Sequence, residues 1–270
     1  MKIPSMIYGT AWKEERTEAL VQSALSSGFK AIDTANQRKH YHEAGVGAAL
    51  KHAFDQGLDR DDLFIQTKFT SINGQDHRLP YEADAKPASQ VQQSFERSLT
   101  HLGLSFIDAY VLHGPCTGQG LIDTDWEIWH AMEALLDAGH IGAIGISNVN
   151  IEQLNALYDG ARIKPQYVQN RCYAQLGWDY SVLSFCLKNN IHYQGFSLLT
   201  ANPMVLAQLG PLSQKHQKTP EQVIFRFSQQ VGMIPLTGTS SLAHMALDLD
   251  LDFSLSDDEI QQIAQMGLGH

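Results

Sequence analysis

Short apolar segments alternate with longer amphipathic segments along most of the chain. The short segments are typical of buried strands, and the longer ones repeat apolar residues at helical spacing. This pattern predicts strands over residues 5–10, 30–34, 63–69, 107–113, 141–147, 167–170, 192–197 and 233–238. It predicts helices over residues 15–27, 88–102, 125–138, 220–230 and 255–266.

The alternation of strand and helix indicates a parallel sheet, because parallel neighbours need a crossover helix between them. Eight such units in 270 residues favour a closed (β/α)8 barrel, the TIM barrel, over an open sheet. No GxGxxG motif follows the first strand, which argues against the open dinucleotide-binding fold. We therefore expect residues 1–270 to form a single barrel domain, with the polar segment 70–88 as an extended loop over one mouth.

Charge and cysteine content narrow the class of protein. The net charge of −10 argues against binding to nucleic acid, which requires a basic face. The three cysteines are scattered and form no CxxC pair, which is typical of reduced thiols in a cytoplasmic protein. No apolar run reaches the ~18 residues of a membrane span, and the N-terminus lacks a secretion signal. We expect a cytoplasmic protein with neither a membrane nor a nucleic-acid partner.

Charged and polar residues end the second, third and fourth predicted strands. These are Asp33, Lys68 and His113, and chemistry in such barrels lies at the carboxyl ends of the strands. A buried isolated charge is costly, so we expect Asp33 and Lys68 to pair. Such a pair can lower the pKa of a nearby phenol, and a histidine can orient a carbonyl oxygen. Each residue alone would more often be structural, but together they predict general-acid chemistry on a carbonyl.

The motifs "IDTA", "YHEAGVG", "LFIQTK", "IDAYVLHGP", "IGAIGISNV" and "YVQN" resemble the aldo-keto reductase superfamily from Gly9 to about Asp248. The resemblance implies a TIM barrel that reduces aldehydes or ketones with NAD(P)H, using an Asp, a Tyr, a Lys and a His. Asp33, Lys68 and His113 match three of these four. Relatives often carry an N-terminal hairpin plug and a long C-terminal tail. Here we expect the plug to be reduced or absent, the tail to be short and the protein to be a monomer.

The fourth residue, the proton donor, is displaced in this chain. The family's tyrosine lies five residues after the aspartate, where this sequence has Arg38. Tyr41 is the only phenol in the segment, and we assign it as the donor, with His40 as the alternative. His40 and His42 flank it without the spacing of metal ligands, so we expect no metal.

The resemblance also implies a cofactor site. The family holds the nicotinamide carboxamide with residues that correspond to Ser147, Asn148 and Gln169, and it stacks the ring on an aromatic side chain, here Phe196. The remaining residues that the resemblance places at the cofactor are Gly9, Thr10, Ser197, Leu199, Thr237, Gly238, Ser240 and His244.

The phosphate-binding motif departs from the family. Leu236 stands where many relatives have lysine, His244 replaces a glutamine, and no Lys or Arg follows Arg226. The expected cofactor is NADPH, with NADH as an alternative, and the preference for NADPH should be weak.

The substrate is expected to be a small carbonyl compound, in a pocket whose rim includes Trp12, Phe69 and the 70–88 loop. Two other functions stay open. The chain could be a cofactor-binding regulatory module with little turnover, or a barrel isomerase or lyase that uses Lys68 as a Schiff base.

Overall fold

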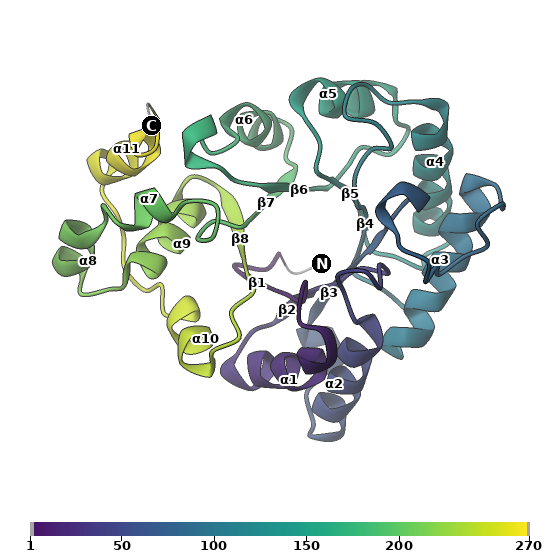
Figure 1. Cartoon of the computed structure of the whole chain (residues 1–270), viewed down its shortest axis with the longest axis horizontal. Coiled ribbons are helices and arrows are strands. Elements are labelled where there is room, and N and C mark those ends of the chain that lie inside the picture. Colours follow the sequence, from purple (N-terminus) through teal and green to yellow (C-terminus); the bar gives the residue numbers. More distant parts are fainter. Residues whose placement is uncertain (1–2, 269–270) are drawn as a thin grey trace.

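Parallel strands close on one another in the order β1 to β8 in the computed structural model, which describes residues 3–268 (Figure 1). The barrel closes where Ile7 and Tyr8 pair with Leu236 and Thr237. This confirms the expected (β/α)8 barrel. The strands are β1 Ile7–Gly9, β2 Ala31–Asp33, β3 Phe64–Phe69, β4 Ala109–Leu112, β5 Ile144–Ser147, β6 Tyr167–Arg171, β7 His192–Phe196 and β8 Met233–Thr237.

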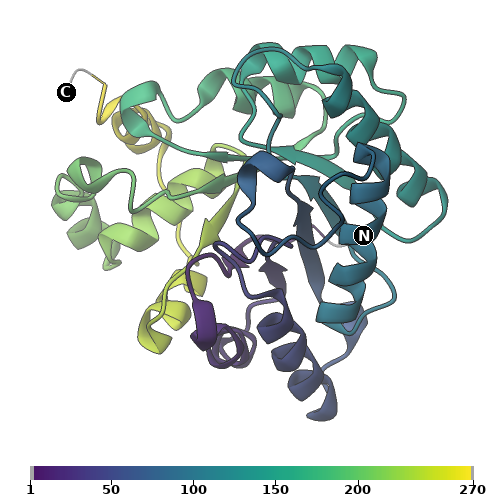
Figure 2. The ribbon, with the colours of Figure 1, turned by 45° about the vertical axis from the view of Figure 1, so that its right-hand side comes forward.

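Helices surround the barrel on its outside (Figures 1 and 2). Local signals set their ends: Pro87 opens one helix, and Gly103 ends it in the left-handed conformation. The α-helices are α1 Thr17–Ser27, α2 Glu43–Asp55, α3 Pro87–Leu102, α4 Asp123–Asp137, α5 Ile151–Gly160, α6 Tyr180–Lys188, α7 Pro203–Leu206, α8 Gly210–His216, α9 Pro220–Gln230, α10 Leu242–Leu249 and α11 Asp257–Gln265. Short 3₁₀ helices are η1 Glu14–Arg16, η2 Arg60–Asp62, η3 Ile72–Gly74 and η4 Ala174–Leu176.

The barrel interior is built in layers. An apolar layer fills the barrel at the end where the strands begin. Most of the strands and their flanks contribute to it, and the rings of Phe64 and Tyr167 lie 5.5 Å apart in it. Above it lie buried glutamines and then the Asp33–Lys68 pair. Within residues 3–268 no β-hairpin precedes β1, and the apolar side chains close the bottom themselves. The members of this layer are Ile7, Ala31, Phe64, Ala109, Ala143, Tyr167 and Ile234.

Residues 70–86 form an anchored loop that contains η3, and α3 begins at Pro87, within the segment 70–88 that was predicted as loop. The Tyr81 hydroxyl donates to the Thr70 carbonyl at 2.8 Å, and the Tyr81 ring packs against Phe69 at 5.7 Å. Phe69 is fully buried by this packing, so its expected place on the pocket rim was wrong.

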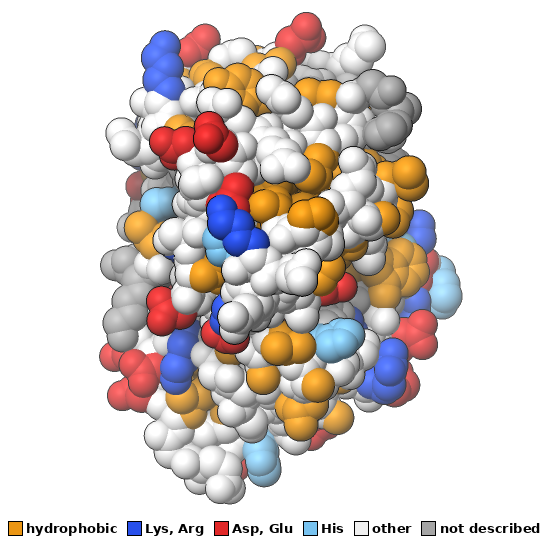
Figure 3. Space-filling model, turned by 90° about the vertical axis from the view of Figure 1, so that its left-hand side faces the viewer, with side chains coloured by type: hydrophobic (Ala, Val, Ile, Leu, Met, Phe, Trp, Pro, Cys, Tyr) orange, Lys and Arg blue, Asp and Glu red, His pale blue; other side chains and the backbone are white. Residues whose placement is uncertain are grey.

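The outer surface mixes charge types. Figure 3 views the face over α8, α10 and α11, where acidic, basic and hydrophobic side chains are interspersed. No helix in the described part of the chain is long and apolar enough to cross a membrane.

Candidate active site

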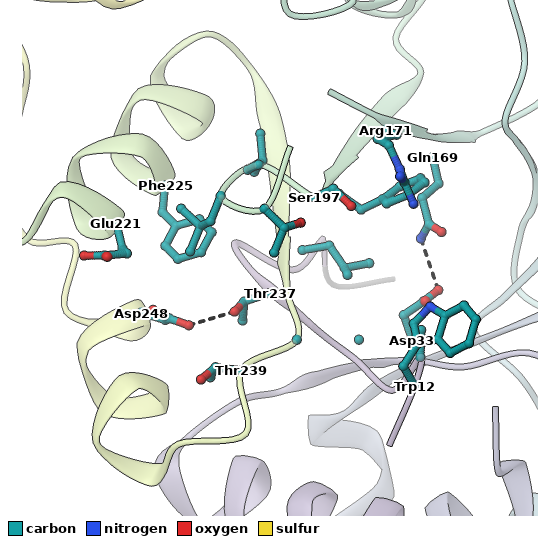
Figure 4. A pocket seen from close by; sticks show the side chains of 18 of the residues that line it. Trp12, Asp33, Gln169, Arg171, Ser197, Glu221, Phe225, Thr237, Thr239 and Asp248 are labelled. Carbon is teal, nitrogen blue, oxygen red and sulfur yellow. Dashed lines mark hydrogen bonds between the residues drawn. The ribbon is translucent and has the colours of Figure 1, made fainter. Parts of the chain in front are cut away.

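A pocket of about 580 Å³ opens at the carboxyl ends of the strands. Figure 4 shows it extending from Trp12, Asp33 and Arg171 at one end to Glu221 and Asp248 at the other. Thr10, Lys68 and Ser240 do not line it. The predicted site residues that do are Gly9, Trp12, Asp33, Tyr41, His113, Ser147, Asn148, Gln169, Phe196, Ser197, Leu199, Thr237, Gly238 and His244.

Asp33 and Lys68 form the expected pair beneath the pocket floor. The Lys68 ammonium lies 2.5 and 2.6 Å from the two Asp33 carboxylate oxygens and donates to the Thr34 carbonyl at 2.9 Å. Lys68 is fully buried. Burial lowers the pKa of Lys68, and the adjacent Asp33 carboxylate opposes that shift. The pair is therefore a fixed, desolvated ion pair whose outer face meets the pocket.

Buried amides hold the Asp33 carboxylate in place. Gln66 and Gln169 both donate to Asp33 Oδ1, at 2.7 and 3.1 Å, and both also donate to the Gln194 side-chain oxygen. Gln194 in turn donates to Gln66 at 2.8 Å. Three strands thus support one carboxylate, and this network gave no signal in the sequence.

A helical turn in the β2–α2 connection positions Tyr41. The backbone N–H groups of His40 and Tyr41 both donate to the Gln37 carbonyl, at 3.1 and 2.9 Å. The Gln37 side chain donates to the Gly74 carbonyl at 2.6 Å, and the Trp12 N–H donates to the His40 carbonyl at 2.7 Å. The turn accommodates the longer spacing between Asp33 and Tyr41 in this chain. Its hydrogen bonds with the backbones of Gly74 and Trp12 hold it in place.

Tyr41, His40 and Arg38 make different contacts, although Tyr41 and His40 both line the pocket. The Tyr41 ring lies 5.8 Å from the His113 ring, and the Lys68 ammonium lies 5.2 Å from its centre. The His40 ring stacks on the exposed Trp12 ring at 4.0 Å. Arg38 pairs with Glu15 at 2.9 Å on the surface. Of the three, only Tyr41 contacts both Lys68 and His113.

The expectation that the ion pair lowers the pKa of the phenol was wrong. The pKa of Tyr41 is raised well above its usual value, first by burial and then by the Asp33 carboxylate. The Lys68 charge is already balanced by Asp33 at close range, so burial decides the direction. Tyr41 is therefore protonated at neutral pH.

His113 stays neutral for a similar reason. Burial, the Lys68 charge and His40 lower the pKa of His113 to about 3. Its Nδ1 lies 2.7 Å from the Thr70 hydroxyl. If Thr70 donates to Nδ1, Nε2 carries the proton and is a hydrogen-bond donor.

This shift predicts a pH-dependent stability. The unfolded imidazole gains a proton below its usual pKa of about 6.5, whereas the folded one gains it only near pH 3. The contribution of His113 to the free energy of unfolding is thus complete above about pH 6.5 and is lost as the pH falls towards 3. Urea denaturation midpoints between pH 7 and 4 should fall less for His113→Gln than for the wild type. His52→Gln, which removes an exposed imidazole, is the control and should follow the wild type.

The ends of β5 and β6 present amides and hydroxyls to the pocket. Ser147 donates to the Gln169 carbonyl at 2.7 Å, and Asn148 donates to the His113 carbonyl at 2.8 Å. Asn148 and Ser197 both have left-handed backbone conformations, with φ of 53° and 57°. Such conformations are unfavourable for side-chain-bearing residues and are concentrated at functional sites.

Arg171 and Glu221 are pocket residues that the sequence reading missed. The Arg171 guanidinium lies over the Phe196 ring at 5.4 Å. Glu221 lies in the first turn of α9, which begins with a capping box of Thr219 and Gln222. The "TPEQ" signal predicts the helix start, but nothing local shows that this start reaches the pocket.

A search against protein-family models matches the Aldo/keto reductase family over residues 5–267. The chain belongs to this family. It is 30% identical to the glyoxal reductase of Bacillus subtilis over 92% of this chain and 82% of that protein. It is 30% identical to the methylglyoxal reductase of Escherichia coli over 96% and 88%. A crystal structure of an aldo-keto reductase complexed with NADPH superposes with a TM-score of 0.82, at 25% identity over 100% and 86% of the chains.

The chain is thus an NAD(P)H-dependent oxidoreductase of the aldo/keto reductase family that acts on small carbonyl compounds. The expectation of a nicotinamide cofactor is confirmed at this level. The residues at the Asp33 end of the pocket fit the nicotinamide half of the dinucleotide, because amides and hydroxyls surround that end. The opposite end has carboxylates and fits a phosphate dianion poorly. Within residues 3–268 no cluster of His, Cys, Asp or Glu has the arrangement of a metal site.

Proposed function

We propose that this aldo/keto reductase reduces a small aldehyde or ketone to the alcohol with Tyr41 as the proton donor. The observation that carries this is the contact of the Tyr41 ring with both the Lys68 ammonium and the His113 ring, at the floor of the pocket. The bound dinucleotide supplies the hydride. The Tyr41 phenol, protonated at neutral pH, gives its proton to the carbonyl oxygen as negative charge develops there.

Lys68 and Asp33 act on the phenol rather than on the substrate. The phenolate that Tyr41 leaves behind is an anion in a dry site, and the Lys68 ammonium stabilises it from below. Asp33, fixed by Gln66 and Gln169, keeps Lys68 charged and in place. The His113 Nε2–H donates to the carbonyl oxygen and turns it towards Tyr41.

The strand ends on the β5–β7 side hold the nicotinamide. Ser147, Asn148 and Gln169 bind its carboxamide, and Phe196 offers the stacking face. Within the described residues, both side-chain hydrogen bonds of Gln169 are made by its amide nitrogen, so its amide oxygen can accept from the carboxamide. The other predicted contacts with the dinucleotide are Gly9, Thr10, Ser197, Leu199, Thr237, Gly238, Ser240 and His244.

The experiment is a turnover assay on small aldehydes. The family relatives named glyoxal reductase and methylglyoxal reductase suggest 2-oxoaldehydes as first substrates. We expect loss of dinucleotide absorbance at 340 nm together with formation of the hydroxy product. Tight dinucleotide binding without turnover of any aldehyde in a broad panel would instead favour the regulatory module.

Trp12 is proposed as a wall of the substrate pocket. Its ring is 66% exposed and stacked on His40, so it contributes little to folding. Trp12→Ala should raise KM for aldehydes by roughly two- to tenfold, because the substrate loses its contact with one aromatic ring, and kcat should be nearly unchanged. Trp12→Phe, which keeps a ring, should stay close to the wild type. A drop in kcat with constant KM would place Trp12 outside the substrate contact.

A further inference from the structure

The pocket end furthest from Asp33 carries two carboxylates. Glu221 comes from the first turn of α9 and Asp248 from the last turn of α10, and both line the pocket. Figure 4 shows them at the same end, on the side away from Trp12 and Arg171. Asp248 is 3% exposed and accepts a hydrogen bond from the Thr237 hydroxyl at 2.7 Å. Two acids from separate helices therefore line the end of the pocket where the second half of a dinucleotide would lie.

No lysine or arginine of residues 3–268 lines this end of the pocket. Among the lysines and arginines of residues 3–268, only Arg171 lines the pocket, and it lies at the opposite end (Figure 4). Lys215 is paired with Glu259 at 2.8 Å, and Lys218 is paired with Asp250 at 2.6 Å. The interspersed charges on the face over α8 and α10 likewise form no basic patch (Figure 3). The Lys13 ammonium donates to the Gly238 carbonyl and does not line the pocket.

The nearby hydroxyls have partners within the protein, and only Thr237 uses its O–H group in the bond it makes. Thr237 donates to Asp248. The Thr239 hydroxyl accepts from the Ser241 N–H at 3.2 Å, and the Ser241 hydroxyl accepts from the His244 N–H at 3.4 Å as the cap of α10. A phosphate placed here would meet two carboxylates and, within residues 3–268, no pocket-lining lysine or arginine, with neutral hydroxyl donors such as those of Thr239 and Ser241. A ribose with free hydroxyls would meet two acceptors.

We propose that Glu221 and Asp248 make this enzyme selective for NADH over NADPH. Their carboxylates accept hydrogen bonds from the adenosine ribose hydroxyls and repel a phosphate on the 2′-oxygen. The same division of roles holds in other dinucleotide sites, where an acidic residue binds the ribose 2′-hydroxyl and an arginine binds the 2′-phosphate. The inference rests on the proposed function, because the position of the nicotinamide near Tyr41 decides which half of the dinucleotide reaches these acids.

The charge on Asp248 makes the selectivity depend on pH. Burial, with a smaller contribution from Glu221, raises the pKa of Asp248 to about 6 against the opposing effects of the Thr237 hydrogen bond and of His244. Asp248 is therefore ionised at pH 8 and partly neutral at pH 6. Repulsion of a 2′-phosphate is strongest at the higher pH.

The test is the dissociation constant of NADH and of NADPH, measured at pH 8 by quenching of protein fluorescence. We expect NADH to bind about ten- to a hundredfold more tightly than NADPH. This is the size of effect expected from repulsion between like charges near a protein surface. Glu221→Gln and Asp248→Asn should each reduce this ratio by about tenfold, mainly by tightening NADPH binding. Glu152→Gln is the matched control, since it removes an exposed first-turn acid of α5 outside the pocket, and it should leave the ratio unchanged.

Several results would overturn the inference. If the wild type bound NADPH as tightly as NADH or more tightly, the proposed NADH selectivity would be refuted, while the proposed reductase function would stand. A ratio unchanged in Glu221→Gln would also remove it, and this variant decides the matter if Asp248→Asn fails to fold, because Glu221 is only half-buried. Binding of neither dinucleotide would refute the proposed function together with the inference.

Discussion

Replacing Tyr41 with phenylalanine is expected to lower kcat for carbonyl reduction by about 10²–10⁴-fold, the range typical of a lost general acid. The change removes only the hydroxyl. The ring contacts with His113 and Lys68 do not depend on that oxygen and should persist. The dissociation constants of the dinucleotides should therefore change little, and the loss should lie in the chemical step. Single-turnover measurements at saturating cofactor separate that step from binding and product release.

The control for this prediction is the neighbouring histidine. His40→Ala removes a ring that lies on Trp12 and contacts neither Lys68 nor the His113 ring face, so kcat should stay within a few-fold of the wild type. Loss of activity in His40→Ala alone would transfer the donor role to His40. Equal losses in both variants would show that neither acts alone as the acid.

The barrel was predictable from sequence because its signal is distributed over the whole chain. Each strand is a short apolar run followed by a helical pattern, and an error in one unit does not change the closed order of the others. Asp33, Lys68 and His113 could be placed for the same reason, since each is the last or next-to-last residue of an apolar run or follows it directly. The carboxyl end of each strand lies at the mouth, and the order of the strands sets the position around it.

Features that depend on contacts between distant segments could not be predicted in this way. The turn that directs Tyr41 rather than Arg38 into the pocket is fixed by Gln37, whose partner Gly74 lies in another loop. The amides beneath Asp33 come from β3, β6 and β7, which lie far apart in the sequence, so their contact with one carboxylate becomes visible only in the closed barrel. Glu221 lines the pocket from the start of α9, which is separated from β7 in the chain by α7 and α8. The absence of cations after Arg226 was visible in sequence, but the two acids that face the pocket required the fold.

The Asp33–Lys68 pair offers the second large effect. Lys68→Met deletes a fully buried charge and keeps a side chain of similar shape, and turnover should fall by about 10²–10⁴-fold because the phenolate of Tyr41 loses its counter-charge. The protein should still fold. The free energy of unfolding should fall by about 3–5 kcal/mol, since the Asp33 carboxylate is left buried without its partner. Gln66 and Gln169 still donate to that carboxylate and limit the damage.

A double variant separates the two roles of the pair. In Lys68→Met/Asp33→Asn the buried charge is gone, while the amide oxygen of the new asparagine side chain can still accept from Gln66 and Gln169. Stability should return towards that of the wild type, because the penalty of the single variant is an uncompensated charge rather than lost packing. Turnover should stay as low as in Lys68→Met. Lys51→Met, which breaks an exposed pair with Asp55 at 2.6 Å, is the control and should change neither property measurably. If the double variant is as unstable as the single one, the pair holds the barrel together by packing and hydrogen bonding. If Lys68→Met retains turnover, the ammonium does not act on Tyr41, and the assignment of the proton donor loses its main support.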